Sequence, residues 1–191
     1  MPTPKVSGYE RGMVIDMNNR TERQNIQKWR TLAGILALLW MCVIFAFSAQ
    51  EKEESSEVSE AISYRMVSST GLLFHLHLDE EQLREIASAI ENTVRKAAHM
   101  TEYGILSILF YVWLGKWQFR VRRRVITATA FAALYAVSDE IHQLFVPGRA
   151  GMVRDVVIDS IGAALGIFVF LGVKKCISFL WNRRRFKAKK L

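Results

Sequence analysis

The hydrophobic residues of this chain are gathered into four long blocks, with mostly polar connections between them. A helix needs about 20 mostly apolar residues to cross the hydrocarbon core of a bilayer, and each block approaches that length. The blocks are residues 31–49, 97–115, 125–146 and 156–173. The pattern predicts an all-α, polytopic membrane protein whose four transmembrane helices form a bundle over residues 31–173.

The connection between the first two blocks, residues 50–96, is the one substantial loop. Asp79 and Gln82 have the spacing of a capping box at the start of a helix. Apolar residues then follow at helical spacing, namely Leu83, Ile86, Ala87, Ile90 and Val94. We expect an amphipathic helix that runs into the second block and lies on the membrane or on the other helices. Residues 55–69 are a weaker amphipathic candidate.

The charge pattern sets the expected topology. The net charge is +8, but the basic residues lie beside the hydrophobic blocks and form no aromatic-interleaved patch, so no nucleic acid partner is expected. Residues 116–124 and 174–191 are basic, and residues 50–96 are mainly acidic. By the positive-inside rule both termini are cytoplasmic and the protein is a multi-pass protein of the cell membrane. Residues 1–30 show no clear helical period before Asn25 and are expected to be a mobile basic tail, with 174–191 as a second tail.

The polar residues of the four spans fall at the ends that this topology places outside. Residues three or four positions apart share a helix face, so several of them form stripes on their helices. The candidates, in chain order, are Ser48, Arg95, His99, Glu102, Tyr135, Asp139, Glu140, His142, Gln143, Arg149, Asp155 and Asp159. Gly162 and Gly166 continue the last stripe as a small-residue motif that allows another helix to approach closely. We expect one shallow cavity that is open to the outside.

Each candidate has an expected role. The catalytic candidates are His99, Glu102, Asp139, His142 and Asp159, with a histidine as general acid or base and Asp139 orienting it or sharing its proton. The binding candidates are Arg95, Glu140, Gln143, Arg149, Asp155, Ser48 and Tyr135. Arginines, including Arg154 at the mouth, suit bidentate recognition of phosphate or carboxylate.

Simpler roles remain open for some of these residues. Glu140 could equally pair with Arg149 or Arg154 at the surface, and Asp155 could only stabilise a helix N-terminus. The spacing of the histidines and carboxylates matches no dedicated metal motif, so no metal site is predicted and the cofactor stays unknown. Cys42 and Cys176 are not expected to form a disulfide, because they lie at different depths.

Three motifs in fixed order give the chain a family resemblance. They are RKAAHMTEY at residues 95–103, SDEIHQLFVPGR at 138–149 and DVVIDSIG at 155–162, together with FSAQ at 47–50. The chain resembles the VanZ-like membrane proteins over residues 31–173. The resemblance implies a small polytopic membrane protein, related to one that lowers susceptibility to teicoplanin in Gram-positive bacteria. It departs at Asp159, where family sequences often carry Asn.

Three kinds of function fit these features. One is an enzyme that acts at the outer face on an anionic lipid-linked or cell-envelope amphiphile. Another is a non-catalytic protein that binds a lipid headgroup, a lipidated antibiotic or another membrane protein through the same cavity. The last, a transporter or proton relay, needs polar groups through the membrane depth, whereas the inner halves of the spans are apolar. Membrane lipids are expected partners in each case, and the oligomeric state stays open.

Overall fold

The computed structural model describes residues 8–50 and 52–188 and, within these ranges, the side chains of residues 20–50 and 53–183. This part of the chain contains helices and no strand, which confirms the all-α prediction. The helices are α1 (Gly8–Ser48), α2 (Lys52–Leu73), α3 (Glu80–Leu114), the short 3-10 helix η1 (Gly115–Trp117), α4 (Val121–Gln143) and α5 (Val153–Ala188).

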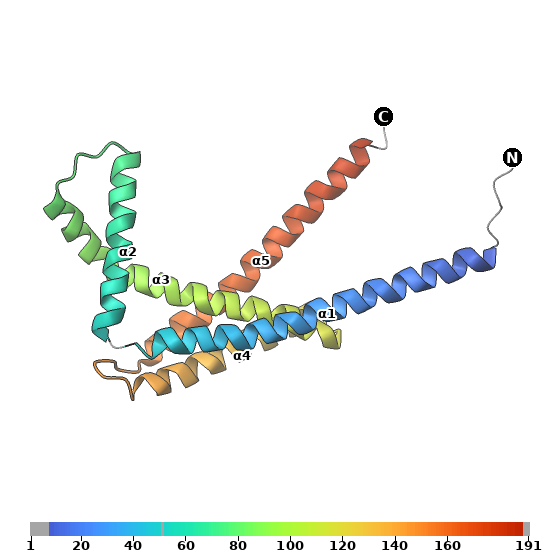
Figure 1. The fold of residues 1–191 in the computed structure, drawn as a ribbon, viewed down its shortest axis with the longest axis horizontal. Helices are drawn as coiled ribbons and strands as arrows, with labels where there is room; N and C mark the ends of the chain where they lie inside the picture. The colour runs from blue at the N-terminus through green and yellow to red at the C-terminus, as the bar shows by residue number, and fades with distance from the viewer. Residues whose placement is uncertain (1–7, 51, 189–191) are drawn as a thin grey trace.

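The central helix is α3, which contacts α1, α2, α4 and α5 (Figure 1). In this view α2 stands steeply to α1 at one end of the bundle. It forms an antiparallel hairpin with the first half of α3, because Tyr64 in its second half donates a hydrogen bond to Glu80, while Ser56 near its start accepts one from Arg95. The residues of the hairpin therefore stand over the end of the bundle that carries the polar candidates.

The start of α3 is the predicted capping box. The Gln82 backbone N–H donates to Asp79 Oδ1 at 2.8 Å, and the Asp79 backbone N–H donates to Gln82 Oε1 at 3.1 Å. The helix then continues without a break to Leu114, so the amphipathic helix and the second apolar block are one element. The weaker candidate over residues 55–69 is also helical, as part of α2.

Small residues bring α3 and α5 into close contact. Gly166 faces Gly104 so closely that an added Cβ would lie 2.6 Å from the Gly104 Cα atom. Ser107 fixes the crossing, because its hydroxyl donates to the Ala163 carbonyl oxygen at 2.6 Å. The small-residue motif therefore does what the sequence predicted, and it holds α3 and α5 together next to the polar candidates.

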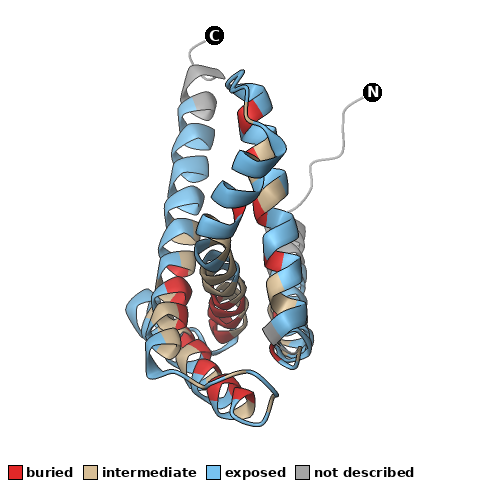
Figure 2. Ribbon diagram, turned by 90° about the vertical axis from the view of Figure 1, so that its left-hand side faces the viewer, coloured by how far each residue is buried: buried red, intermediate tan, exposed pale blue. Residues whose placement is uncertain are grey.

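Many large apolar side chains of the described residues are exposed, and most of the ribbon in Figure 2 has the pale blue of exposed residues. Two segments are long and apolar enough to cross a membrane, Arg20–Ser48 in α1 and Val153–Arg183 in α5. The predicted spans in α3 and α4 do not reach that standard in the described part of the chain. Their apolar stretches are shortened by charged residues, and α4 is free of charge only over residues 125–138. The four-span topology accordingly stays a prediction.

Three boundaries differ from those predicted. Helix α1 begins at Gly8, within the segment that was expected to be a mobile tail, and α5 continues past Val173, the predicted end of the fourth span, to Ala188. Both extensions project from the bundle in Figure 1, and a helix that does not pack on others needs no apolar stripe of the kind on which the prediction relied. Helix α4 ends at Gln143, before the predicted end of its span, because a turn begins there. Residues 1–7 and 189–191 of the predicted tails lie outside the described residues.

Candidate functional site

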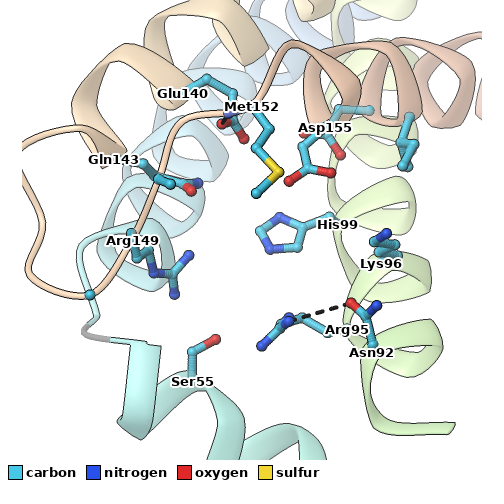
Figure 3. Close-up of a pocket in the computed structure, with 14 residues that line it drawn as sticks. Ser55, Asn92, Arg95, Lys96, His99, Glu140, Gln143, Arg149, Met152 and Asp155 are labelled. Atoms are coloured by element: carbon cyan, nitrogen blue, oxygen red, sulfur yellow. Dashed lines mark hydrogen bonds between the residues drawn. The ribbon is translucent and has the colours of Figure 1, made fainter.

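A cavity of about 200 Å³ opens where the start of α2, the middle of α3, the end of α4 and the start of α5 meet. The loop over residues 144–152 forms one wall (Figure 3). The binding and catalytic candidates that line the cavity are Arg95, His99, Glu140, Gln143, Arg149, Asp155 and Asp159. The structure therefore brings together residues from three of the four predicted spans and from the loop, and their roles stay predictions.

The positive side of the cavity is formed by Arg95, Lys96 and Arg149. Arg95 is held in place by Ser56 and by the i,i+4 partner Glu91, at 3.2 Å and 3.5 Å. Arg149 reaches across from the loop, and its Nε donates to the backbone oxygen of Gln50 at 2.9 Å. Burial and the nearby charge of Arg95 lower the pKa of Arg149, although a guanidinium stays charged in proteins. Arg154, expected at the mouth, is instead exposed and does not line the cavity.

The negative side is formed by Glu140, Asp155 and Asp159. Glu140 is buried, and its Oε2 accepts the backbone N–H of Met152 at 2.8 Å, which ties the loop to the end of α4. The alternative role for Glu140 was an ion pair at the surface. Glu140 is instead buried and accepts this hydrogen bond inside the fold. Asp159 is buried one turn before Gly162, so its position depends on the contact between α3 and α5.

His99 lies in the centre of the cavity, with Asp155 above its ring, Arg95 below it and Arg149 to the left in Figure 3. The charges that act on it most are those of Asp139, Arg149, Asp155 and Arg95. Its Nδ1 lies 3.7 Å from Glu102 Oε2, which is beyond hydrogen-bond distance. The ring is therefore placed between cationic and anionic groups and is open to a ligand.

The remaining candidates lie behind the cavity in a second polar cluster, which we call the inner cluster. Its members are Ser48, Glu102, Tyr103, Tyr135, Asp139 and His142, none of which lines the cavity. Gln143 joins the two groups, since it lines the cavity while its Nε2 donates to Ser48 Oγ at 3.0 Å and to Asp139 Oδ2 at 3.4 Å. Tyr135 donates to the Met41 carbonyl at 2.6 Å, which ties α4 to α1.

Several polar atoms of the inner cluster are buried and form no hydrogen bond of good geometry, although the Tyr103 hydroxyl lies near the Asp139 carboxyl group. They are Glu102 Oε2, Tyr103 OH, Asp139 Oδ1 and His142 Nδ1. The His142 ring packs on Phe45, with 4.3 Å between ring centroids, so its environment is partly aromatic. Tyr103 is a residue that the sequence analysis missed, although its spacing of four from His99 was a usable signal.

The described residues include no group of three His, Cys, Asp or Glu side chains placed to hold a metal ion. Cys42 and Cys176 are both free and exposed. What the cavity presents is a central histidine, guanidinium groups on one side and carboxyl groups on the other. Such a set can bind an anionic group and exchange a proton with it.

Comparison with known proteins gives one result. Residues 33–177 match the family model described as VanZ/LLP1. No curated protein and no solved structure matches the chain. The matched region contains the whole cavity and overlaps both apolar segments that could cross a membrane, in keeping with a membrane protein. Because the match covers most of the chain, this protein belongs to the VanZ-like family.

Proposed function

We propose that the protein binds the anionic group of a lipid-linked or cell-envelope amphiphile at the outer face of the membrane, and that His99 exchanges a proton with it. The observation that carries this proposal is the convergence of two guanidinium groups, from Arg95 and Arg149, on one small cavity with a histidine at its centre (Figure 3). Phosphate and carboxylate are the groups that arginine binds best, because its planar fork matches their oxygens.

The size and position of the cavity support an amphiphile. About 200 Å³ is less than the roughly 300–1,000 Å³ of a typical small-molecule site, so it accommodates a headgroup and not a whole lipid. The apolar faces of α1 and α5 are exposed next to the site, where an acyl or polyprenyl chain would lie in the membrane. A lipidated glycopeptide such as teicoplanin belongs to the same chemical class, and this is how the protein could affect susceptibility to it.

Substitutions of Arg149 can distinguish specific recognition of a headgroup from simple attraction of an anion to positive charge. Its Nε is engaged by the Gln50 carbonyl, so the remaining N–H groups of a planar fork are available to the ligand. Lysine cannot make both contacts. We expect Arg149→Ala and Arg149→Lys to reduce the amount of co-purifying anionic lipid by about ten-fold each, as the loss of one charged hydrogen bond would do. Mass spectrometry of lipids extracted from the purified protein measures the amount of co-purifying anionic lipid.

The matched control for this experiment is Arg154→Ala, which removes the same charge from an exposed position outside the cavity. It should leave the co-purifying lipid unchanged. Full retention by Arg149→Lys, or an equal loss in Arg154→Ala, would show that only surface charge matters and would contradict specific recognition.

A non-catalytic binding protein is the second candidate function. It is favoured by the 3.7 Å between His99 and Glu102, because an acid/base pair would be expected to form a hydrogen bond. The two candidates differ in what happens to the ligand. An enzyme converts the retained amphiphile, and a binding protein returns it unchanged.

The same proposal includes four spans with both termini in the cytoplasm and the α2 hairpin outside. In a background in which Cys42 and Cys176 are replaced by serine, a cysteine at Glu60 should react with a membrane-impermeant maleimide in intact cells. Cysteines at Arg123 and Lys175 should react only after the cells are permeabilised. All three positions are exposed, so access depends on the side of the membrane. Labelling of all three in intact cells would overturn the topology.

A further inference from the structure

Two arginines converge at the other end of the bundle, beside Gly115 at the end of α3. Arg30 comes from α1 and Arg124 from the first turn of α4. A Cβ atom added to Gly115 would lie 2.9 Å from Arg124 Nη2 and 3.0 Å from Arg30 Nε. The two guanidinium groups therefore share the space in front of Gly115, where the glycine leaves room for both.

Arg124 is held firmly in this position. Its Nη2 donates to the Tyr111 carbonyl oxygen at 2.8 Å, and its guanidinium lies over the Tyr111 ring, 4.1 Å from the centroid. A cation at a helix C-terminus is favourable in its own right, and this contact accounts for one arginine. It does not account for the second, and Arg124 Nε is buried with no hydrogen-bond partner.

Two like charges near the same point repel each other, and a bound anion would relieve that repulsion. Burial lowers the pKa of Arg124, and the charge of Arg30 lowers it further. Residues 115–124 include no acidic residue, and within the described part of the chain no ion pair joins Arg30 or Arg124 to a carboxylate. A guanidinium keeps its charge in proteins, so the repulsion is relieved by a bound anion and not by loss of a proton.

The surrounding aromatic residues indicate where that anion comes from. Trp29 precedes Arg30 and is 68% exposed, and Trp117 in η1 is 51% exposed. Trp117 also packs edge-on against Trp113, with 4.9 Å between ring centroids. Exposed tryptophans of this kind gather at the level of the lipid headgroups, where their rings bridge hydrocarbon and water. Arginines at the same level would lie beside the phosphates of the bilayer.

We propose that Arg30 and Arg124 bind the phosphate of an anionic phospholipid between α1, η1 and α4. This site is separate from the outer cavity and belongs to the opposite membrane surface, the cytoplasmic one in the orientation proposed above. The lipid would bridge α1, η1 and α4. It would thereby hold the cytoplasmic end of the bundle together.

The test uses the full-length protein in a neutral detergent, with added phosphatidylglycerol, phosphatidylcholine or inorganic phosphate. Native mass spectrometry measures the retained lipid. We expect the protein to retain phosphatidylglycerol over phosphatidylcholine, and Arg30→Gln to reduce the retained phosphatidylglycerol about ten-fold, the effect of one lost charged hydrogen bond. Arg30→Gln is the decisive variant because it leaves the Arg124 contact with Tyr111 in place.

The matched controls are Arg122→Gln and Arg123→Gln, which remove the same charge from exposed positions in the same helical turn. They should leave retention unchanged. In an Arg149→Ala background the effect of Arg30→Gln should persist, which separates this site from the outer cavity. Equal loss in the controls, equal retention of both lipids, or displacement of phosphatidylglycerol by millimolar inorganic phosphate would each overturn the proposal.

Discussion

Gly162→Ala should destabilise the protein strongly, whereas Gly172→Ala on the same helix should stabilise it slightly. A Cβ at residue 162 would lie 2.5 Å from the Met100 carbonyl oxygen and 2.6 Å from its Cα atom. Both are backbone atoms of α3, so only a shift of the whole helix can relieve the clash. Overpacking of this kind costs about 1–3 kcal/mol or more, which outweighs the roughly 1 kcal/mol that alanine gains over glycine in a helix.

Gly172 is a matched control, because a Cβ added there meets nothing within 4 Å and only the helix-propensity gain remains. Thermal unfolding in detergent, followed by circular dichroism, measures the difference. Equal melting temperatures for the two variants would contradict the close approach of α3 and α5. A shift of α3 away from α5 in Gly162→Ala should also disturb the cavity, because His99 immediately precedes Met100 and Asp159 lies one turn before Gly162.

The depth of the site along its helices could be predicted from the sequence, because counting residues from a helix end gives depth directly. The rotation of α4 was harder to predict, and it decides which residues reach the cavity. The buried stripe of α4 is Ala128, Ala132 and Ala136, and one more step of four gives Glu140, which faces the cavity. This stripe was a usable signal. It places His142 to the side, against Phe45.

The loop between α4 and α5 shows what could not be predicted. Arg149 reaches the cavity because it binds the backbone of Gln50, which is 99 positions away, and because Met152 binds Glu140. Neither contact leaves a periodic pattern in the sequence. Arg149 and Arg154 therefore looked equivalent as residue types, and only the fold of the loop separates the arginine in the cavity from the exposed one.

If the protein is an enzyme, His99→Ala should slow conversion of the bound amphiphile strongly, and His142→Ala should slow it far less. His99 lines the cavity among the charges of Arg149 and Asp155, whereas His142 does not line it and has its ring against Phe45. Loss of a general acid or base slows a reaction by about 10²–10⁴-fold. The measurement is mass spectrometry of envelope lipids after incubation with the purified protein, with each variant compared at equal concentration and after confirmation that it is folded.

Retention of the ligand separates the two candidate functions in the same experiment. If the protein is an enzyme, His99→Ala keeps most of the anionic lipid that Arg149→Ala loses, because the guanidinium groups of Arg95 and Arg149 are intact, but it leaves that lipid unconverted. A larger loss of conversion in His142→Ala than in His99→Ala would show that the proton passes through the inner cluster. If the wild-type protein also returns its lipid unchanged, His99 serves binding and the protein is a headgroup-binding member of its family.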